Sequence, residues 1–243
     1  MTADLRSPDD SASDVLDDVR NRIMPELSSK YPTVSALYEG QNREASKTID
    51  SLVLVGPIIL ILIYMVIAFT FRTYSQPFLL MIMIPFSLIG VVFGHWAHGF
   101  MINILSWLGI IALIGIMVND GLVLIGKFNG YLKEGMKYNE ALVQAGKSRF
   151  RAIFLTSLTT IAGLAPLLLE GSRQAQFLKP MAVSISYGIG IATVLTLVML
   201  PLLLSISNSV KVFFKWMITG RKISKEEVER AIIESKYEND ELH

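Results

Sequence analysis

Asp120 is the residue in this sequence whose position most clearly calls for a chemical role. It lies within residues 104–126, an apolar stretch in which no other side chain ionises. A charged carboxylate at the centre of a membrane helix costs about 2.5 to 3.5 kcal/mol on insertion scales, so an ionisable residue there indicates a path for ions or protons by default. Two other interpretations stay open: a neutral carboxyl that hydrogen-bonds between helices, or a carboxylate close enough to the membrane surface to be hydrated.

Two polar side chains are candidates to assist Asp120. Asn119 places an amide directly beside it. Asp120 lies seven residues before Lys127, and Thr156 lies at a similar distance from the basic residues that precede it. In antiparallel neighbouring helices both side chains would therefore sit about 8 to 10 Å inside the membrane and could meet. The alternative for Thr156 is that its hydroxyl bonds its own helix backbone.

Small residues recur at helical spacing in three of the apolar stretches. Such residues let membrane helices approach closely, although glycine is also simply common in these helices. The residues that we predict to serve helix packing are Gly90, Gly94, Gly109, Gly115, Gly121, Thr159, Thr160 and Gly163.

Other chemistries find less support in the residues. His95 and His98 have the spacing of a metal-binding pair, but no carboxylate or thiol stands beside them, and the chain has no cysteine. The eleven methionines are scattered among aliphatic positions, where methionine usually fills space. There is no nucleophile-and-base constellation and no phosphate-binding glycine loop. We predict neither an enzyme nor a bound cofactor.

Composition predicts an α-helical integral membrane protein. Apolar residues make up 52% of the chain and the mean hydropathy is +0.49. A net charge of +1 gives no reason to expect a nucleic-acid partner, so the lipid bilayer is the expected environment. A membrane-spanning helix needs roughly 20 apolar residues. Five stretches within residues 51–207 approach this length: 52–71, 78–94, 104–126, 152–169 and 181–205.

Basic residues in the connections predict the orientation, because lysine and arginine are retained on the cytoplasmic side. They are concentrated in residues 127–151 and again after the fifth span, whereas residues 95–103 contain none. Residues 127–150 show apolar residues at helical spacing, which predicts one helix along the cytoplasmic interface. We therefore expect a cytoplasmic tail at 208–243 and an N-terminal segment outside.

The N-terminal residues 1–50 have the pattern of a partial fold. Apolar residues from Val15 to Leu27 form one helical face, and residues 33–38 have the pattern of a short strand. One helix and one strand cannot bury a core of their own. The segment also contains no apolar export signal, so we expect a preceding portion of the protein that is missing from this sequence.

Several runs in the membrane segments resemble one known family. They are residues 71–77 (FRTYSQP), 84–90 (IPFSLIG), 108–120 (LGIIALIGIMVND) and 149–160 (RFRAIFLTSLTT). In this order they are similar to the C-terminal membrane half of the resistance-nodulation-division (RND) transporters, hydrophobe/amphiphile efflux branch, of the AcrB-like type. The resemblance covers roughly residues 12–207. It implies the last five spans of a twelve-span fold, preceded at 1–50 by the end of a periplasmic α/β porter domain.

The resemblance further implies a proton-driven antiporter in the bacterial inner membrane that exports amphiphilic compounds. Such pumps work as homotrimers with a periplasmic adaptor and an outer-membrane channel. Their proton relay includes a lysine, a threonine and an arginine, which correspond here to Asn119, Thr156 and Arg149. The family's lysine is therefore replaced, and a carboxylate, Asp120, occupies the next position. We hypothesise that Asp120 titrates in place of the lysine.

Two alternatives remain on sequence grounds. The chain is compatible with a membrane scaffold or a non-transporting remnant, in which Asp120 would have no role. It is also compatible with a heavy-metal exporter of the same superfamily, for which it offers only dispersed methionines as soft ligands.

Overall fold

The computed structural model describes residues 18–31, 41–221 and 224–233. The chain divides into two compact units, residues 1–57 and 58–243. In the first unit a π-helical turn, η1 (Val19–Ile23), continues into the short helix α2 (Met24–Lys30), so a helix is present where the apolar face predicted one. The strand predicted over 33–38 lies outside the described residues.

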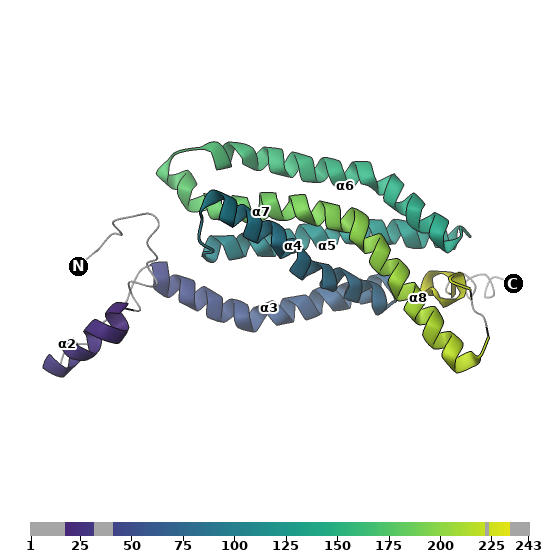
Figure 1. The fold of residues 1–243 in the computed structure, drawn as a ribbon, viewed down its shortest axis with the longest axis horizontal. Coiled ribbons are helices and arrows are strands. Elements are labelled where there is room, and N and C mark those ends of the chain that lie inside the picture. Colours follow the sequence, from purple (N-terminus) through teal and green to yellow (C-terminus); the bar gives the residue numbers. More distant parts are fainter. Residues whose placement is uncertain (1–17, 32–40, 222–223, 234–243) are drawn as a thin grey trace. The chain divides into compact units, whose positions relative to one another are not determined.

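The second unit is a set of long helices, shown in Figure 1. Helix α3 (Gln41–Phe71) begins in the first unit, and α4 (Ser75–His98), α5 (Ile104–Lys133) and α6 (Tyr138–Leu169) follow. Helix α7 (Arg173–Val194) passes through the π-helical turn η2 (Leu195–Met199) into α8 (Leu200–Thr219). Five of these stretches are long and apolar enough to cross a membrane, and no strand occurs in the part of the chain that is described. The predicted helical membrane fold with five spans is confirmed.

The connection after the third span differs from the prediction. We expected a single helix over residues 127–150, but α5 continues to Lys133 and α6 already begins at Tyr138. The break contains Gly135, whose φ of 86° lies in the left-handed region that glycine adopts without a steric penalty. Residues 127–150 are therefore the ends of two long helices joined by a tight turn.

The fifth span is also longer than predicted at both ends. We expected residues 181–205, whereas the helix runs from Arg173 through η2 to Thr219. Its start is capped by Ser172, whose hydroxyl accepts the Ala175 N–H, and its end is closed by Gly220 at a φ of 66°. The tail expected to begin at 208 thus starts with about three further turns of helix, which end at Thr219.

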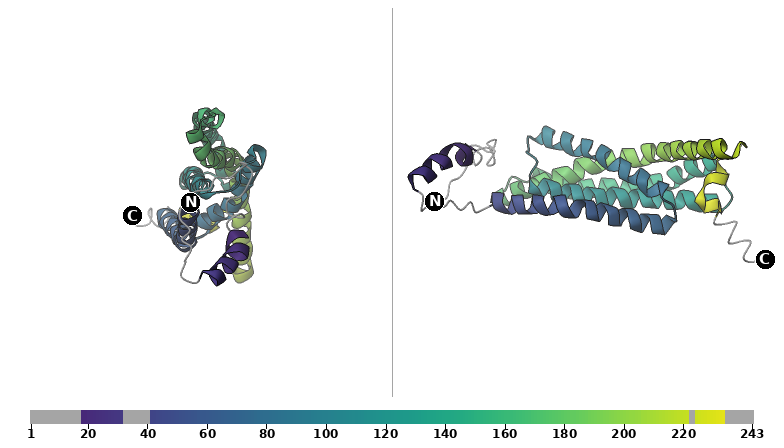
Figure 2. Two further views of the ribbon diagram at one scale, coloured as in Figure 1. Left: turned by 90° about the vertical axis from the view of Figure 1, so that its left-hand side faces the viewer. Right: turned by 90° about the horizontal axis from the view of Figure 1, so that it is seen from below.

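The core of the second unit lies between α4, α5 and α7. Helix α7 packs along both α4 and α5, and α6 packs against α5 and α7. Figure 2 shows these helices with their axes roughly aligned in the second unit. The contact surfaces are filled by side chains that are fully buried, such as Met83, Leu113, Leu124, Ile125, Val183 and Leu200.

Segment 224–233 forms hydrogen bonds with both the start of α6 and α8. The Tyr138 hydroxyl, buried at the start of α6, donates to the Leu204 carbonyl of α8 at 2.8 Å. The backbone N–H of Tyr138 donates to Glu226 Oε1 at 3.1 Å, and Asn208 Nδ2 donates to Glu229 Oε1 at 2.7 Å. Glu226 lies in the short 3-10 helix η3 (Glu226–Val228). Three hydrogen bonds therefore join three separate elements.

Glu226 makes this attachment dependent on pH. Its pKa is lowered below the ordinary 4.5, chiefly because the Tyr138 backbone N–H donates to the carboxylate. A carboxyl whose pKa is lowered by folding stabilises the folded form above its unfolded pKa, and this contribution is lost as the pH falls through the lowered value. We therefore expect segment 224–233 to loosen below pH 4.5.

Hydrogen exchange of segment 224–233, followed by mass spectrometry over a pH series, measures this loosening. Glu226→Gln is expected to exchange faster than the wild type at neutral pH and to match it in acid. Glu227→Gln, a change at the exposed neighbour, serves as the control. Equal exchange of Glu226→Gln and the wild type at neutral pH would contradict the prediction.

Candidate functional site

Helix α5 holds Asp120 at the edge of its buried face. That face runs through Met117, Gly121 and Leu124, spaced by one helical turn each, and a Cβ on Gly121 would collide with Leu80 of α4. Asn119 lies on the opposite side of the helix and is exposed. Asp120 lies between the two sides and is half-buried. No described residue forms a hydrogen bond or an ion pair with its carboxylate.

Helix α6 carries the other two relay candidates. Thr156 is exposed, and its hydroxyl bonds the backbone carbonyls of Ala152 and Ile153 at 2.8 and 3.0 Å. The Thr156 hydroxyl therefore bonds its own helix backbone, which is the second of the two roles that the sequence allowed for it. Arg149 lies two turns earlier on the same side of the helix, about 10 Å away along the axis. Its Nε is buried without a hydrogen-bond partner among the described residues.

Among the described residues, no hydrogen bond connects the α5 pair with the α6 pair. Helices α5 and α6 pack against each other, but no hydrogen bond joins Asp120 to Thr156 in the described part of the chain. Thr159 and Thr160 also bond their own helix, through the carbonyls of Leu155 and Thr156. Each of these hydroxyls is therefore satisfied locally, whereas the Asp120 carboxylate is not.

Four of the predicted packing glycines lie at close helix contacts. A Cβ on Gly90 would lie 2.5 Å from the Tyr187 carbonyl oxygen, and one on Gly94 would lie 2.6 Å from the Tyr187 ring. A Cβ on Gly109 would lie 2.7 Å from the Met181 carbonyl oxygen. With the Leu80 contact of Gly121, these residues set how closely α4 and α5 approach their neighbours.

The two other predicted glycines face open space. A Cβ on Gly115 of α5 or on Gly163 of α6 would meet nothing within 4 Å. Gly188 of α7, which sequence reasoning missed, instead packs tightly against Leu113. The signal that could have revealed it is the pair Ser184 and Gly188, two small residues four positions apart.

Exposed polar and small residues therefore mark one face of α5 and one face of α6. Both helices are apolar enough to span a membrane, yet these faces carry an amide, hydroxyls and bare glycine backbone. In water such faces would be ordinary, but within a bilayer they favour a protein neighbour over lipid. Their exposed members are Gly115 and Asn119 on α5, and Thr156, Thr159 and Gly163 on α6.

A second polar site, around His95, closes the other end of the core. The sequence suggested this histidine only as half of a poorly supported metal-binding pair with His98. His95, at the end of α4, is only 3% exposed. Its Nδ1 donates to the Val91 carbonyl oxygen at 2.9 Å, and its Nε2 is 2.8 Å from the Ser106 hydroxyl. Asn103 caps α5 by accepting the Ser106 N–H, and Ser184 of α7 donates to the Ser106 carbonyl. Nδ1 thus bonds its own helix and Nε2 joins α4 to α5, while Ser184 attaches α7 to the same Ser106.

Replacing His95 should weaken the fold measurably. We expect His95→Ala to lower the free energy of unfolding by about 1 to 3 kcal/mol, because buried polar partners are left unsatisfied. His98→Ala is the matched comparison: this histidine is exposed, and its hydrogen bond to the Tyr187 hydroxyl at 3.0 Å is open to solvent, so its loss should cost less, about 1 kcal/mol or below. Unfolding of the two variants in mixed detergent micelles measures the difference. Equal stability of the two would contradict a structural role for His95.

Two further polar pairs link helices in the membrane region. The hydroxyls of Ser157 on α6 and Thr193 on α7 are 2.6 Å apart and buried. Gln76 and Asn129 exchange two amide hydrogen bonds, at 2.9 and 3.0 Å, between α4 and α5. Each pair satisfies its own polar groups, so neither offers a free site for chemistry.

Comparison with known proteins agrees with this architecture. The model of the AcrB/AcrD/AcrF family matches residues 5–207. The swarming motility protein SwrC of Bacillus subtilis is 35% identical over 58% of this chain and 14% of its own length. The multidrug resistance protein MdtC of Escherichia coli O1:K1 is 30% identical over 81% of this chain and 19% of its own length.

A solved structure supports the same assignment. The crystal structure of a heavy metal efflux pump superposes with a TM-score of 0.67 at 25% identity, covering 82% of this chain and 20% of that one. The chain thus spans between 14% and 20% of the length of these similar proteins. The family model covers most of the residues of this chain, which has the five-span fold described above. The chain is therefore a member of the AcrB/AcrD/AcrF family of RND efflux transporters.

Proposed function

We propose that this chain contributes part of the proton pathway of an efflux pump driven by the proton gradient, with Asp120 as the group that binds the proton. The observation that carries the proposal is the half-buried Asp120 carboxylate, which lies in an apolar span without a hydrogen-bond partner among the described residues. An ionisable residue in such a position marks an ion or proton path by default.

Protonation of Asp120 would change which surroundings the carboxyl tolerates. The charged form needs water, a cation or hydrogen-bond donors, whereas the neutral form can lie against apolar side chains. The two forms therefore favour different arrangements of α5 against its neighbours, which couples proton binding to a conformational change. Asn119, Thr156 and Arg149 are the proposed assisting groups, since each carries a polar atom on α5 or α6.

The exposed polar faces of α5 and α6 support a further part of the proposal. We propose that other membrane helices of the transporter cover these faces, because lipid would not satisfy Asp120 and Asn119. The complete pump would be a homotrimer in the bacterial inner membrane, joined by a periplasmic adaptor and an outer-membrane channel. Its N-terminal segment would be periplasmic and its C-terminus cytoplasmic, following the distribution of lysine and arginine.

The proposed cargo is an amphiphilic compound, in line with the multidrug relative. A heavy-metal cation is the second candidate, because the similar solved structure is a heavy metal efflux pump. Growth of cells carrying the complete transporter in the presence of cationic dyes or of cobalt, zinc and cadmium salts separates the two. Protection against only one class assigns the cargo.

The proton coupling is tested in proteoliposomes that contain the complete transporter. An imposed pH gradient is expected to drive cargo movement together with an opposite proton flux, and both are expected to depend on Asp120. Cargo movement that ignores the gradient would overturn the proposal. A chain that assembles but moves neither protons nor cargo would favour the scaffold or remnant alternative.

A further inference from the structure

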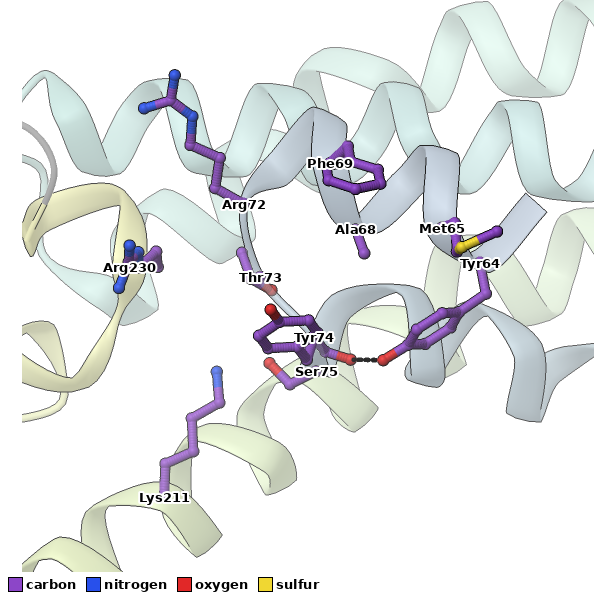
Figure 3. A pocket seen from close by; sticks show the side chains of 10 residues that line it. All are labelled: Tyr64, Met65, Ala68, Phe69, Arg72, Thr73, Tyr74, Ser75, Lys211 and Arg230. Atoms are coloured by element: carbon purple, nitrogen blue, oxygen red, sulfur yellow. Dashed lines mark hydrogen bonds between the residues drawn. The ribbon is translucent and has the colours of Figure 1, made fainter. Parts of the chain in front are cut away.

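A cavity of about 1120 Å³ lies where α3 passes into α4, at the same end of the helices as segment 224–233. Figure 3 shows the ten residues that line it. They come from the last turns of α3, the turn into α4, α8 and the segment after η3. The lining residues are Tyr64, Met65, Ala68, Phe69, Arg72, Thr73, Tyr74, Ser75, Lys211 and Arg230.

Three basic side chains line the cavity. Arg72, Lys211 and Arg230 line it from three separate parts of the chain, and none of the ten described residues around it is acidic. Lys211 also lies 3.5 Å from Glu229, which offsets part of this charge. Ser75, the first residue of α4, adds the positive end of a 24-residue helix, which favours anions. Together these features fit an anionic ligand.

The backbone at Arg72 has an uncommon conformation. Its φ is 48°, in the left-handed region, and it is the one non-glycine residue with positive φ among the described residues. The turn is held by the Tyr64 hydroxyl, which donates to the Tyr74 carbonyl at 3.1 Å (Figure 3). Because Arg72 directly follows Phe71, the last residue of α3, this left-handed conformation ends the helix and turns the chain toward α4 beside the cavity.

One wall of the cavity is apolar and continues along a membrane span. Met65, Ala68 and Phe69 belong to α3, and Phe69 is 80% exposed. A ligand that uses both walls needs an anionic group beside a hydrocarbon chain. We propose that this cavity binds an anionic phospholipid, with the phosphate near Arg72 and Lys211 and an acyl chain along α3. A soluble phosphate would leave the apolar wall unused, and a zwitterionic headgroup would bring its own cation into the positive site.

Binding is tested with the full 243-residue chain in a neutral detergent. Dioctanoyl phosphatidylglycerol and dioctanoyl phosphatidylcholine are added separately, and bound lipid is counted by native mass spectrometry. We expect the anionic lipid to bind more tightly than the zwitterionic one. Arg72→Asn should weaken binding of the anionic lipid about fivefold, the effect expected for one basic residue near a lipid surface. Asparagine suits this test because it tolerates the left-handed backbone.

Two further variants make the outcome specific. Arg72→Lys keeps the charge and should retain most of the binding. Arg221→Asn removes a charge from an exposed residue beyond the end of α8 that does not line the cavity, and should leave binding unchanged. Equal binding of the two lipids, or equal losses in Arg72→Asn and Arg221→Asn, would overturn the proposal. Displacement of phosphatidylglycerol by an equal concentration of inorganic phosphate would assign the cavity to a soluble anion and overturn the lipid assignment.

Discussion

Asp120→Asn is expected to reduce export by the complete transporter to the level of cells that lack it. The substitution keeps the size and most of the polarity of the side chain but removes the proton-binding group. Because Asp120 is the only ionisable residue within residues 104–126, no neighbour on that span can take over its titration. A proton gradient acts only through groups that bind protons differently in two conformations, so transport should stop while assembly continues.

The measurement is dye efflux from energised cells, with the amount of transporter in the membrane determined in parallel. Asp120→Glu keeps a titratable carboxyl and is expected to recover part of the activity. Asn119→Ala serves as a neighbouring change that leaves the carboxyl in place, and it should reduce export less than Asp120→Asn. Normal export by Asp120→Asn, at normal abundance, would refute the role of this residue.

Gly109→Ala is expected to destabilise the chain strongly, whereas Gly115→Ala on the same helix is not. The added methyl group at residue 109 would lie 2.7 Å from both the Met181 carbonyl oxygen and Ser184 Cβ. The carbonyl belongs to the backbone of α7, so the helices must separate, at a cost of about 1 to 3 kcal/mol for an overpacked core. At residue 115 nothing lies within 4 Å, and alanine is a better helix former than glycine by about 0.8 to 1 kcal/mol.

Unfolding in mixed micelles of the isolated chain, monitored by circular dichroism, compares the two variants. A loss of stability in Gly109→Ala together with a neutral or positive effect in Gly115→Ala is the expected pattern.

Gly115→Ala also tests the contacts of α5 in the complete transporter. If other helices cover the α5 face as proposed, this variant should impair the assembled pump although it does not harm the isolated chain. Similar losses of stability in both isolated variants would contradict the packing of α5 against α7.

The sequence by itself determined that this chain is a helical membrane protein with five spans. It also identified Asp120 as the ionisable residue within the third span. Both conclusions depend on local properties: a span needs enough consecutive apolar residues, and a charge within a span is costly wherever the helix packs. The motifs in residues 71–160 indicated the family because they, too, are local: each is a run of consecutive residues that can be recognised without knowing which residues are neighbours in space.

Tertiary structure alone decided which residues face one another. Gly109 and Gly115 look alike in the sequence, yet a Cβ on Gly109 would collide with α7, whereas one on Gly115 would meet no other element within 4 Å. The difference arises because the rotation of α5 about its axis is set by all its neighbours together. The break near Gly135 was missed because apolar residues keep their helical spacing on both sides of it, while the turn depends on one backbone angle. His95 lies just beyond the predicted span 78–94, and only the packing of α4 against α5 and α7 buries it and brings its ring to Ser106. Spacing along a chain records periodicity, but burial and hydrogen-bond partners arise only when separate helices come together.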